Sequence, residues 1–398
     1  MCAHMKILVA DKLSENALVE LKALGSELRV EPKLNADTLP DAIGDADILI
    51  VRSTRVKAAA MDAATSLSLI IRAGAGVNTI DVGHASSQGI HVANCPGKNA
   101  DAVAELTLGL IIAADRRIAY QAEQLRAGGW NKKEYSKADG LKGKTIGIVG
   151  YGSIGKAVAK RAKSFGISVI AWSRSLNPQI AEAQGIAYCP NTLQLARDAD
   201  IISLHLAVAP ETMNLVNAEF LDAMKDGAIL VNTSRGEIVD QAALEEAIDK
   251  KSLKVALDVY SDEPDANSNK FSHTELAKRI TGTHHIGAST NQASDAIAYE
   301  TVRIVESYIR TGKAINQVNT QEKSPAPYKL VVRHFNRVGV LAGILSALRG
   351  ANINVEEMEN AIFSGQAAAV CTLKLDEKPT ESIIRVINSN PDIIQATL

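Results

Sequence analysis

Three ionisable residues with complementary chemistry follow three predicted strands in the second half of the chain. Arg235 comes shortly after AILVN, Glu263 stands before Pro264 in DVYSDEP, and His285 ends the stretch ITGTHH. Because ligands of open parallel sheets bind at the carboxyl ends of the strands, we expect these side chains to meet. An arginine fork holds a carboxylate, an imidazole carries a proton near neutral pH, and a glutamate on its other nitrogen fixes the tautomer. The three side chains predict proton transfer beside a bound carboxylate, with His284 as an alternative that spacing alone does not separate from His285.

The sequence GYGSIG, which begins at Gly150, indicates that the reaction uses a bound cofactor. It fits G-x-G-x-x-G and lies between the apolar KTIGIV and the helical KAVAKRAKSFG. In such a turn Gly150 permits the bend, Gly152 lets a pyrophosphate approach, and Gly155 lets helix and strand pack closely. An NAD site usually has an acid about 20 residues on, but here AWSRS supplies Ser173 and Arg174. This pair can accept a 2′-phosphate, or it can be a solvated loop beside a permissive adenosine site, so the predicted cofactor is NADP or NAD.

The surrounding pattern must position these groups. From Lys6 onward, apolar runs alternate with helical stretches, which predicts an α/β fold with doubly wound parallel sheets. A helix over 101–128 is predicted to bridge two lobes, and a helix over 295–312 to return to the first lobe. Beyond the polar stretch at 321–327, a β-α-β-β-α-β pattern predicts a ferredoxin-like domain. We therefore expect a discontinuous flavodoxin-like substrate-binding domain over 1–98 and 289–318, a Rossmann-type dinucleotide-binding domain over 99–288, a linker over 319–327 and a further domain over 328–398.

Composition points to a small-molecule partner. The 398 residues carry 43 Lys+Arg and 45 Asp+Glu, a formal net charge of −2, so nothing indicates nucleic acid or a membrane surface as partner. The longest apolar stretch, at 108–114, is too short to span a bilayer, and the opening MCAHM does not begin a signal peptide, which predicts a cytoplasmic protein. The cysteines are scattered without metal-ligand spacing, which predicts reduced thiols and no metal site. They are Cys2, Cys95, Cys189 and Cys371.

Taken together, these motifs resemble those of the D-isomer-specific 2-hydroxyacid dehydrogenases. The segments LHLAVAPETMNLVN, MKDGAILVNTSRGEIVD and DVYSDEP extend the resemblance over nearly all of 1–318. The resemblance implies that Arg235, Glu263 and His285 are catalytic and that Asp258 lies near the nicotinamide carboxamide. The implied cofactor-binding residues are Gly150, Tyr151, Gly152, Ser153, Ile154, Gly155, Ser173, Arg174, His205, Thr233 and Asp258.

Within that family, VRSTR, RAGAGVNTID and NCPGKNA are similar to the substrate loops of D-3-phosphoglycerate dehydrogenases. Their arginines suit a phosphate beside a carboxylate, although interdomain ion pairs are an alternative role. The implied substrate-binding residues are Arg52, Ser53, Arg72, Gly74, Ala75, Gly76 and Asn99, with Arg55 as a further candidate. The implied reaction oxidises 3-phosphoglycerate to 3-phosphohydroxypyruvate, the first step of L-serine biosynthesis. A glyoxylate or hydroxypyruvate reductase and a non-catalytic, dinucleotide-sensing corepressor are the alternatives.

The C-terminal region resembles the ACT regulatory domain. HFNRVGVL at 334–341 is similar to the serine-binding stretch found in bacterial members of the family, although Val338 replaces a common proline. The resemblance implies that His334, Asn336 and Asn354 contact L-serine as an effector. A dimerisation module without ligand is the alternative, and we expect a homodimer or homotetramer.

Overall fold

The computed structural model describes residues 5–264, 270–321 and 324–398. The prediction for Cys2 and part of the linker predicted at 319–327 therefore lie outside the described residues. The chain divides into two compact units, Met1–Asn319 and Thr320–Leu398. Among the described residues, no helix combines the length and apolarity needed to cross a bilayer.

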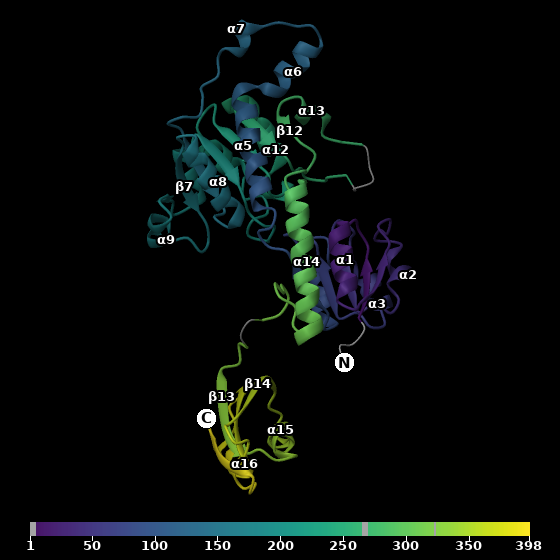
Figure 1. Cartoon of the computed structure of the whole chain (residues 1–398). Helices are drawn as coiled ribbons and strands as arrows, with labels where there is room; N and C mark the ends of the chain where they lie inside the picture. Colours follow the sequence, from purple (N-terminus) through teal and green to yellow (C-terminus); the bar gives the residue numbers. More distant parts are fainter. Residues whose placement is uncertain (1–4, 265–269, 322–323) are drawn as a thin grey trace. The chain divides into compact units, whose positions relative to one another are not determined.

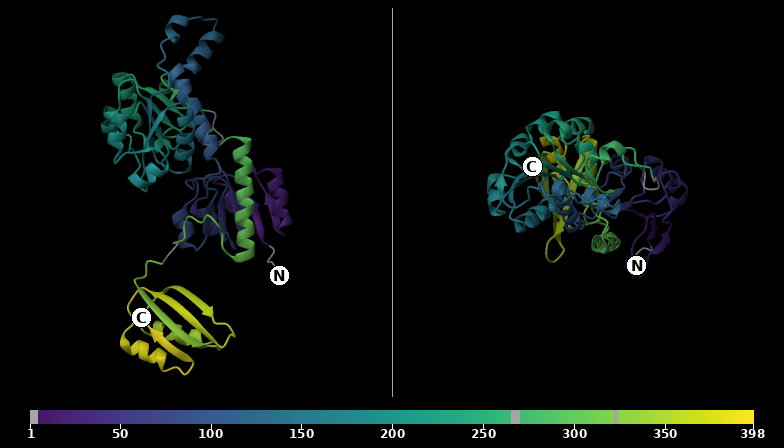
Figure 2. Two further views of the ribbon diagram at one scale, coloured as in Figure 1. Left: turned by 60° about the vertical axis from the view of Figure 1, so that its left-hand side comes forward. Right: turned by 90° about the horizontal axis from the view of Figure 1, so that it is seen from above.

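The first unit contains two parallel sheets. The smaller sheet has the strand order β2-β1-β3-β4-β5, which is the flavodoxin-like order. Its strands are β1 (Lys6–Val9), β2 (Glu27–Val30), β3 (Ile48–Val51), β4 (Leu69–Arg72) and β5 (His91–Asn94). The helices of this lobe are α1 (Glu15–Ala23), α2 (Leu39–Ile43), α3 (Ala58–Ala63) and α4 (Val82–Ser87). The long helix α14 (Asn291–Thr311) packs against α1, as two views show (Figures 1 and 2), so the chain returns to this lobe after completing the second sheet.

The larger sheet has the order β12-β11-β10-β9-β6-β7-β8. Its strands are β6 (Thr145–Val149), β7 (Ser168–Trp172), β8 (Ala187–Tyr188), β9 (Ile201–Leu204), β10 (Ile229–Asn232), β11 (Lys254–Leu257) and β12 (Thr281–Gly282). Its helices are α5 (Ala100–Arg116), α6 (Ile118–Arg126), α7 (Lys132–Tyr135), α8 (Ser153–Ser164), α9 (Pro178–Ala183), α10 (Thr192–Asp198), α11 (Ala218–Ala223), α12 (Gln241–Lys251) and α13 (Thr274–Ala277), with a 3₁₀ turn η1 (Gly236–Ile238). The order reverses between β6 and β9, the switch point at which such sheets bind ligands, and the predicted doubly wound fold is confirmed.

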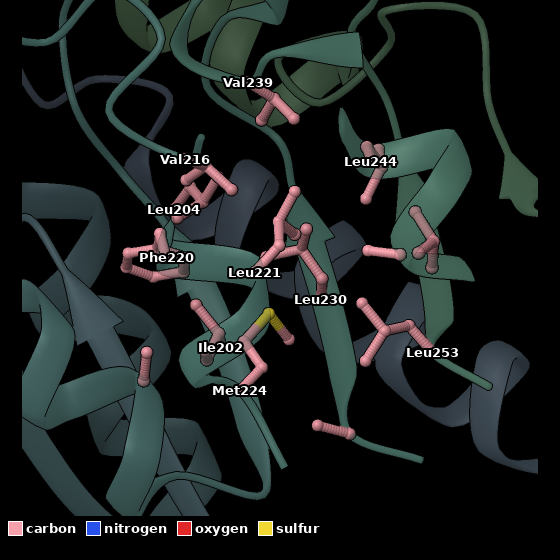
Figure 3. Close-up of a cluster of buried hydrophobic side chains, with 14 of the residues drawn as sticks. Ile202, Leu204, Val216, Phe220, Leu221, Met224, Leu230, Val239, Leu244 and Leu253 are labelled. Carbon is pink, nitrogen blue, oxygen red and sulfur yellow. The ribbon is translucent and has the colours of Figure 1, made fainter. Parts of the chain in front are cut away.

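A buried apolar cluster supports the strands that end at the candidate site. Figure 3 shows Ile202 and Leu204 from β9 and Leu230 from β10 beside Phe220 of α11, and all four side chains are buried. Burying one such side chain contributes about 1.5–3 kcal/mol, so the cluster holds β9 and β10 as a rigid platform.

The prediction of one helix over 101–128 is wrong. Arg117 adopts a left-handed φ of 52° and separates α5 from α6. Its guanidinium donates to Glu134 at 2.7 Å and lies over the rings of Tyr120 and Tyr135. These contacts offset the cost of a left-handed arginine, roughly 1–2 kcal/mol, and two of the three partners come from the following α7 region.

The second unit has the predicted β-α-β-β-α-β order. Its antiparallel sheet runs β14-β15-β13-β16, with β13 and β15 in the middle. The elements are β13 (Tyr328–Phe335), α15 (Val340–Gly350), β14 (Val355–Ile362), β15 (Ala368–Leu375), α16 (Glu381–Asn388) and β16 (Ile393–Thr397). Both helices contribute to one apolar core with the sheet, which agrees with the expected ferredoxin-like fold.

Candidate active site

A glutamate and a histidine form the centre of the site. His285 Nδ1 lies 2.6 Å from Glu263 Oε2, and the other carboxylate oxygen accepts from the N–H of Tyr260 at 3.0 Å. Because a carboxylate accepts, Nδ1 carries the proton, and Nε2 remains for proton exchange. Burial alone would raise the pKa of Glu263, but the hydrogen bond from His285 and its charge outweigh burial and lower the pKa. The structure thus pairs Glu263 with His285 and not with His284.

Asp258 anchors the loop that carries His285. The side chain is 1% exposed, and its carboxylate accepts from the Thr283 hydroxyl at 2.6 Å and from the N–H groups of Ile286 and Gly287 at 2.8 Å each. The Asp258 carbonyl also accepts from the N–H of His285 at 2.8 Å. These bonds hold His285 at a left-handed φ of 52°. The sequence predicted Asp258 as a cofactor contact and missed this anchoring of the loop.

Arg235 leaves β10 through a turn organised by Asn232. The Asn232 amide accepts from Ser234 through its oxygen and donates to the carbonyl of Arg235 at 2.8 Å. The guanidinium donates to Ser234 O at 2.6 Å and to Asn78 Oδ1 at 3.3 Å. A Cβ on Gly76 would lie 2.6 Å from the Arg235 guanidinium, so this glycine leaves room for the fork. Asn78 was not predicted, because its approach to Arg235 brings together positions that are 157 residues apart.

Arg72 ends β4 and is mostly buried. Burial, followed by the charges of Arg235 and Arg52, lowers the pKa of Arg72 to about 10. Its Nε atom is buried and has no hydrogen-bond partner among the described residues. A Cβ on Gly74 would overlap the guanidinium, so this glycine leaves room for the Arg72 side chain in its observed position. A buried cation near two further guanidiniums is stabilised by an anion, which makes this lobe a candidate anion site.

Asp11, which the sequence did not single out, positions the loop after β3. Its Oδ2 accepts from the N–H groups of Arg52, Ser53 and Thr54 at 2.7, 3.1 and 3.0 Å. The position of Asp11 shortly after the first strand could have indicated this role. The strands β1 and β3 are neighbours in the sheet, so the residues that follow them lie close together. Asn99 occupies the N-cap position of α5 without a side-chain capping bond, and its Oδ1 is buried with no partner in the described part of the chain.

The turn between β6 and α8 fits a dinucleotide pyrophosphate. A Cβ on Gly150 would lie 2.3 Å from the carbonyl oxygen of His205, and one on Gly155 would lie 2.2 Å from the carbonyl oxygen of Gly150. A Cβ on Gly152 would meet nothing within 4 Å, so the space before α8 is open. No side chain caps α8, which leaves its first N–H groups available to phosphate oxygens. Tyr151, Ser153 and Ile154 belong to the same turn.

The other predicted cofactor residues follow neighbouring strands. Burial lowers the pKa of His205, after β9, to about 3. Its Nε2 lies 2.7 Å from the Ser203 hydroxyl, and its buried Nδ1 has no partner among the described residues. The hydroxyl of Thr233 lies 2.9 Å from that of Thr107 in α5. Ser173 and the exposed Arg174 follow β7.

The predicted effector residues do not come together within one chain. His334 is 2% exposed, and its ring nitrogens lie 2.8 Å from Phe335 O and 3.1 Å from Asn360 Oδ1. Asn336 follows β13, whereas Asn354 lies at the opposite end of the sheet, next to the end of β15. Eight residues of strand separate the two ends, roughly 25 Å at 3.3 Å per residue.

Comparisons with known proteins agree with this geometry. The family description "D-isomer specific 2-hydroxyacid dehydrogenase, NAD binding domain" matches residues 108–287. The chain is 36% identical over 372 residues to a D-3-phosphoglycerate dehydrogenase of Methanocaldococcus jannaschii, covering 92% of this chain and 68% of that protein. This chain belongs to the D-isomer specific 2-hydroxyacid dehydrogenase family. The resemblance predicted from the motifs is confirmed.

Two further members of the family extend the comparison. A hydroxypyruvate reductase of Thermotoga maritima is 38% identical over 303 residues, covering 75% of this chain and 97% of that protein. The NAD⁺-bound 3-phosphoglycerate dehydrogenase of Entamoeba histolytica matches with a TM-score of 0.67 at 27% identity, covering 80% of this chain and 99% of that one. As a family member, the chain is a nicotinamide-dependent oxidoreductase, and the β6–β12 sheet forms its NAD(P)-binding domain.

Proposed function

We propose that the chain oxidises 3-phosphoglycerate to 3-phosphohydroxypyruvate, the first step of L-serine biosynthesis, in the cytoplasm. The main supporting observation is the buried Nε of Arg72, which has no hydrogen-bond partner among the described residues. Burial, followed by the charges of Arg235 and Arg52, lowers the pKa of this guanidinium. A substrate with a single carboxylate engages one guanidinium fork, whereas a phosphate next to a carboxylate supplies charge for all three. The name of the M. jannaschii relative supports the same substrate.

The proposed reaction uses the Glu263–His285 pair as the proton carrier. Arg235 holds the substrate carboxylate, while Arg52 and Arg72 bind the phosphate. As the C2–H bond breaks, His285 Nε2 takes the proton of the C2 hydroxyl, and the C–O bond becomes a carbonyl. A nicotinamide dinucleotide held at the turn between β6 and α8 would supply the acceptor for the hydride from C2. Glu263 keeps Nδ1 protonated and stabilises the imidazolium that forms.

Initial rates with 3-phosphoglycerate, glycerate and, in the reductive direction, glyoxylate test this proposal. We expect kcat/KM for 3-phosphoglycerate to exceed that for glycerate by about 10²-fold or more, because the phosphate adds charge-assisted bonds. Equal rates with glycerate would contradict the phosphate assignment.

A hydroxypyruvate or glyoxylate reductase is the second candidate. The hydroxypyruvate reductase of T. maritima favours it, since that protein is 38% identical over 97% of its own length. Preference for glyoxylate and reduced cofactor in the same rate measurements would support this candidate. Absence of hydride transfer with every substrate would instead support a non-catalytic dinucleotide sensor.

We further propose that NADP(H) is used at least as well as NAD(H). The strand β7 is followed by Ser173 and the exposed Arg174, with no acid to bind a ribose 2′-hydroxyl or to repel a 2′-phosphate. Michaelis constants for both cofactors test this choice, and a strong preference for NAD(H) would contradict it.

The second unit is proposed as an L-serine site shared between two copies of the chain. Asn336 and Asn354 lie at opposite ends of one sheet, so one small ligand can contact both only if they come from different chains. Such a shared site requires at least two copies of the chain, as in a homodimer or a homotetramer. Sedimentation with and without L-serine tests the assembly.

A further inference from the structure

A closed ring of hydrogen bonds holds the turn that carries Glu263. The Ser261 hydroxyl donates to Gln241 Oε1 at 2.6 Å, and Gln241 Nε2 lies 2.9 Å from His273 Nδ1. His273 Nε2 in turn lies 2.8 Å from the carbonyl oxygen of Ser261. Ser261 follows β11, Gln241 opens α12 and His273 precedes α13. The ring therefore ties three separate elements together.

The donors and acceptors of this ring fit only one arrangement. The carbonyl oxygen of Ser261 can only accept a hydrogen bond, so the imidazole of His273 is protonated on Nε2. Its Nδ1 therefore accepts from the Gln241 amide. The second amide hydrogen of Gln241 points to Glu245 Oε1 at 3.0 Å. Each of these donors faces an acceptor, so the hydrogen bonds favour one arrangement of the three side chains over the alternatives.

The ring reaches the reacting centre through a short, strained turn. Asp262 lies between Ser261 and Glu263 and has a left-handed φ of 55°, which costs about 1–2 kcal/mol for a residue other than glycine. The preceding Tyr260 donates its N–H to the Glu263 carboxylate at 3.0 Å. Displacement of Ser261 therefore moves the carboxylate that meets the imidazole.

The same turn also contacts the loop of the substrate arginine. A Cβ on Gly236, next to Arg235, would lie 2.0 Å from the Tyr260 carbonyl carbon and 2.4 Å from the Ser261 nitrogen. On its other side, the Tyr260 ring packs edge-on against Phe271 at 4.9 Å. The turn is fixed between the arginine loop and the segment before α13.

We propose that Gln241, Ser261 and His273 are positioning residues for this reaction, acting through Glu263 on the proton-carrying imidazole. They touch neither the substrate nor the cofactor in the proposed mechanism. Their effect is to keep the carboxylate at hydrogen-bond distance from His285. The inference rests on the proposed role of Glu263, so its test must separate the two.

His273→Phe is the first variant, because it removes both ring nitrogens and keeps the aromatic contact with Phe271. We expect kcat to fall about 10-fold with an unchanged KM for the cofactor, since small misplacements of catalytic groups are costly. In a Glu263→Gln background the same change should have an effect of less than about 2-fold, because coupled residues are non-additive. Gln194→Leu is a control for the loss of a polar contact away from the site: this half-buried glutamine donates to an acid four residues on, Asp198, as Gln241 does to Glu245, and kcat should not change.

Ser261 supplies a second pair of variants. Ser261→Ala removes the hydroxyl and should lower kcat like His273→Phe, whereas Ser261→Thr keeps a hydroxyl and should retain most of the activity. Fluorescence titration with the cofactor and thermal unfolding would be used to check that each variant is folded.

The outcomes distinguish the inference from the function on which it rests. A loss that is equally large in the Glu263→Gln background would overturn the inference and make the ring merely structural. Unchanged kcat in folded His273→Phe and Ser261→Ala, with a large loss in Glu263→Gln, would also overturn it while leaving the proposed mechanism intact. If Glu263→Gln itself retained full kcat, both the role of Glu263 and the inference would be wrong.

Discussion

Replacing Asp258 by asparagine tests how the loop of the catalytic histidine is held. The buried carboxylate accepts from the Thr283 hydroxyl and from the N–H of Ile286 through Oδ1, and from the N–H of Gly287 through Oδ2. Asparagine keeps the shape but offers only one acceptor oxygen. With that oxygen in the position of Oδ1, the amide nitrogen faces the N–H of Gly287, so that two donors oppose each other.

The hydrogen bonds to the Asp258 carboxylate determine how much stability the asparagine variant is expected to lose. One buried N–H without an acceptor costs about 1–3 kcal/mol, and each of the two remaining bonds weakens by roughly 1 kcal/mol when its acceptor loses the charge. Some relaxation of the loop offsets part of this sum, so we expect a loss of about 2–4 kcal/mol in the free energy of unfolding. Relaxation displaces His285, which holds a left-handed φ of 52° in this loop, and we expect kcat to fall about 10²-fold.

Urea unfolding and kcat at saturating substrate measure both effects. Asp226→Asn is the matched control, because that carboxylate is 86% exposed and its one contact within the described part of the chain is a surface ion pair at 3.4 Å. An Asp258→Asn protein with the unfolding free energy and kcat of the parent would refute the anchoring role.

Three further predictions concern the proton carrier, the cofactor and the effector. His285→Ala should lower kcat by about 10²-fold or more at unchanged cofactor affinity, because it removes the base; a larger loss in His284→Ala would reverse the assignment. Arg174→Ala should weaken NADP(H) binding by about 1–3 kcal/mol in fluorescence titrations and leave NAD(H) binding unaltered, since only the former has a 2′-phosphate; equal effects on both would contradict this. L-Serine at millimolar concentration should inhibit the whole chain, and Asn336→Ala should abolish the inhibition. If calorimetry on the whole chain found no serine binding and activity were unaffected, the second unit would serve only in assembly of the oligomer.

The fold was predictable because short apolar runs and their order along the chain specify parallel strands. The four residues of β3 and of β9 are buried along their whole length, which is the pattern of strands covered on both faces. The break at Arg117 was not predictable, since neither glycine nor proline marks it and the stabilising contact with Glu134 is a tertiary one.

Part of the candidate site was also visible in the sequence. Residues that follow neighbouring strands converge at one edge of a sheet, which is why the encounter of Glu263 and His285 could be expected. The supporting contacts were not visible, because they depend on where backbone N–H groups point. The Asp11 carboxylate accepts from three successive N–H groups after β3, and the Asp258 carboxylate accepts from two successive N–H groups in the loop after β12. Such acids look like ordinary strand-end residues until the loop geometry is known.

The central claim is that the arginine group binds a phosphate in addition to a carboxylate. The most direct measurement is the ratio of kcat/KM for 3-phosphoglycerate to that for glycerate, in the parent and in Arg72→Met. We predict a ratio of about 10²-fold or more in the parent, reduced by about 10-fold or more in the variant, since a lost charge-assisted bond is worth about 1.5–3 kcal/mol. A ratio near one in the parent, or a ratio that Arg72→Met leaves unchanged, would contradict this account.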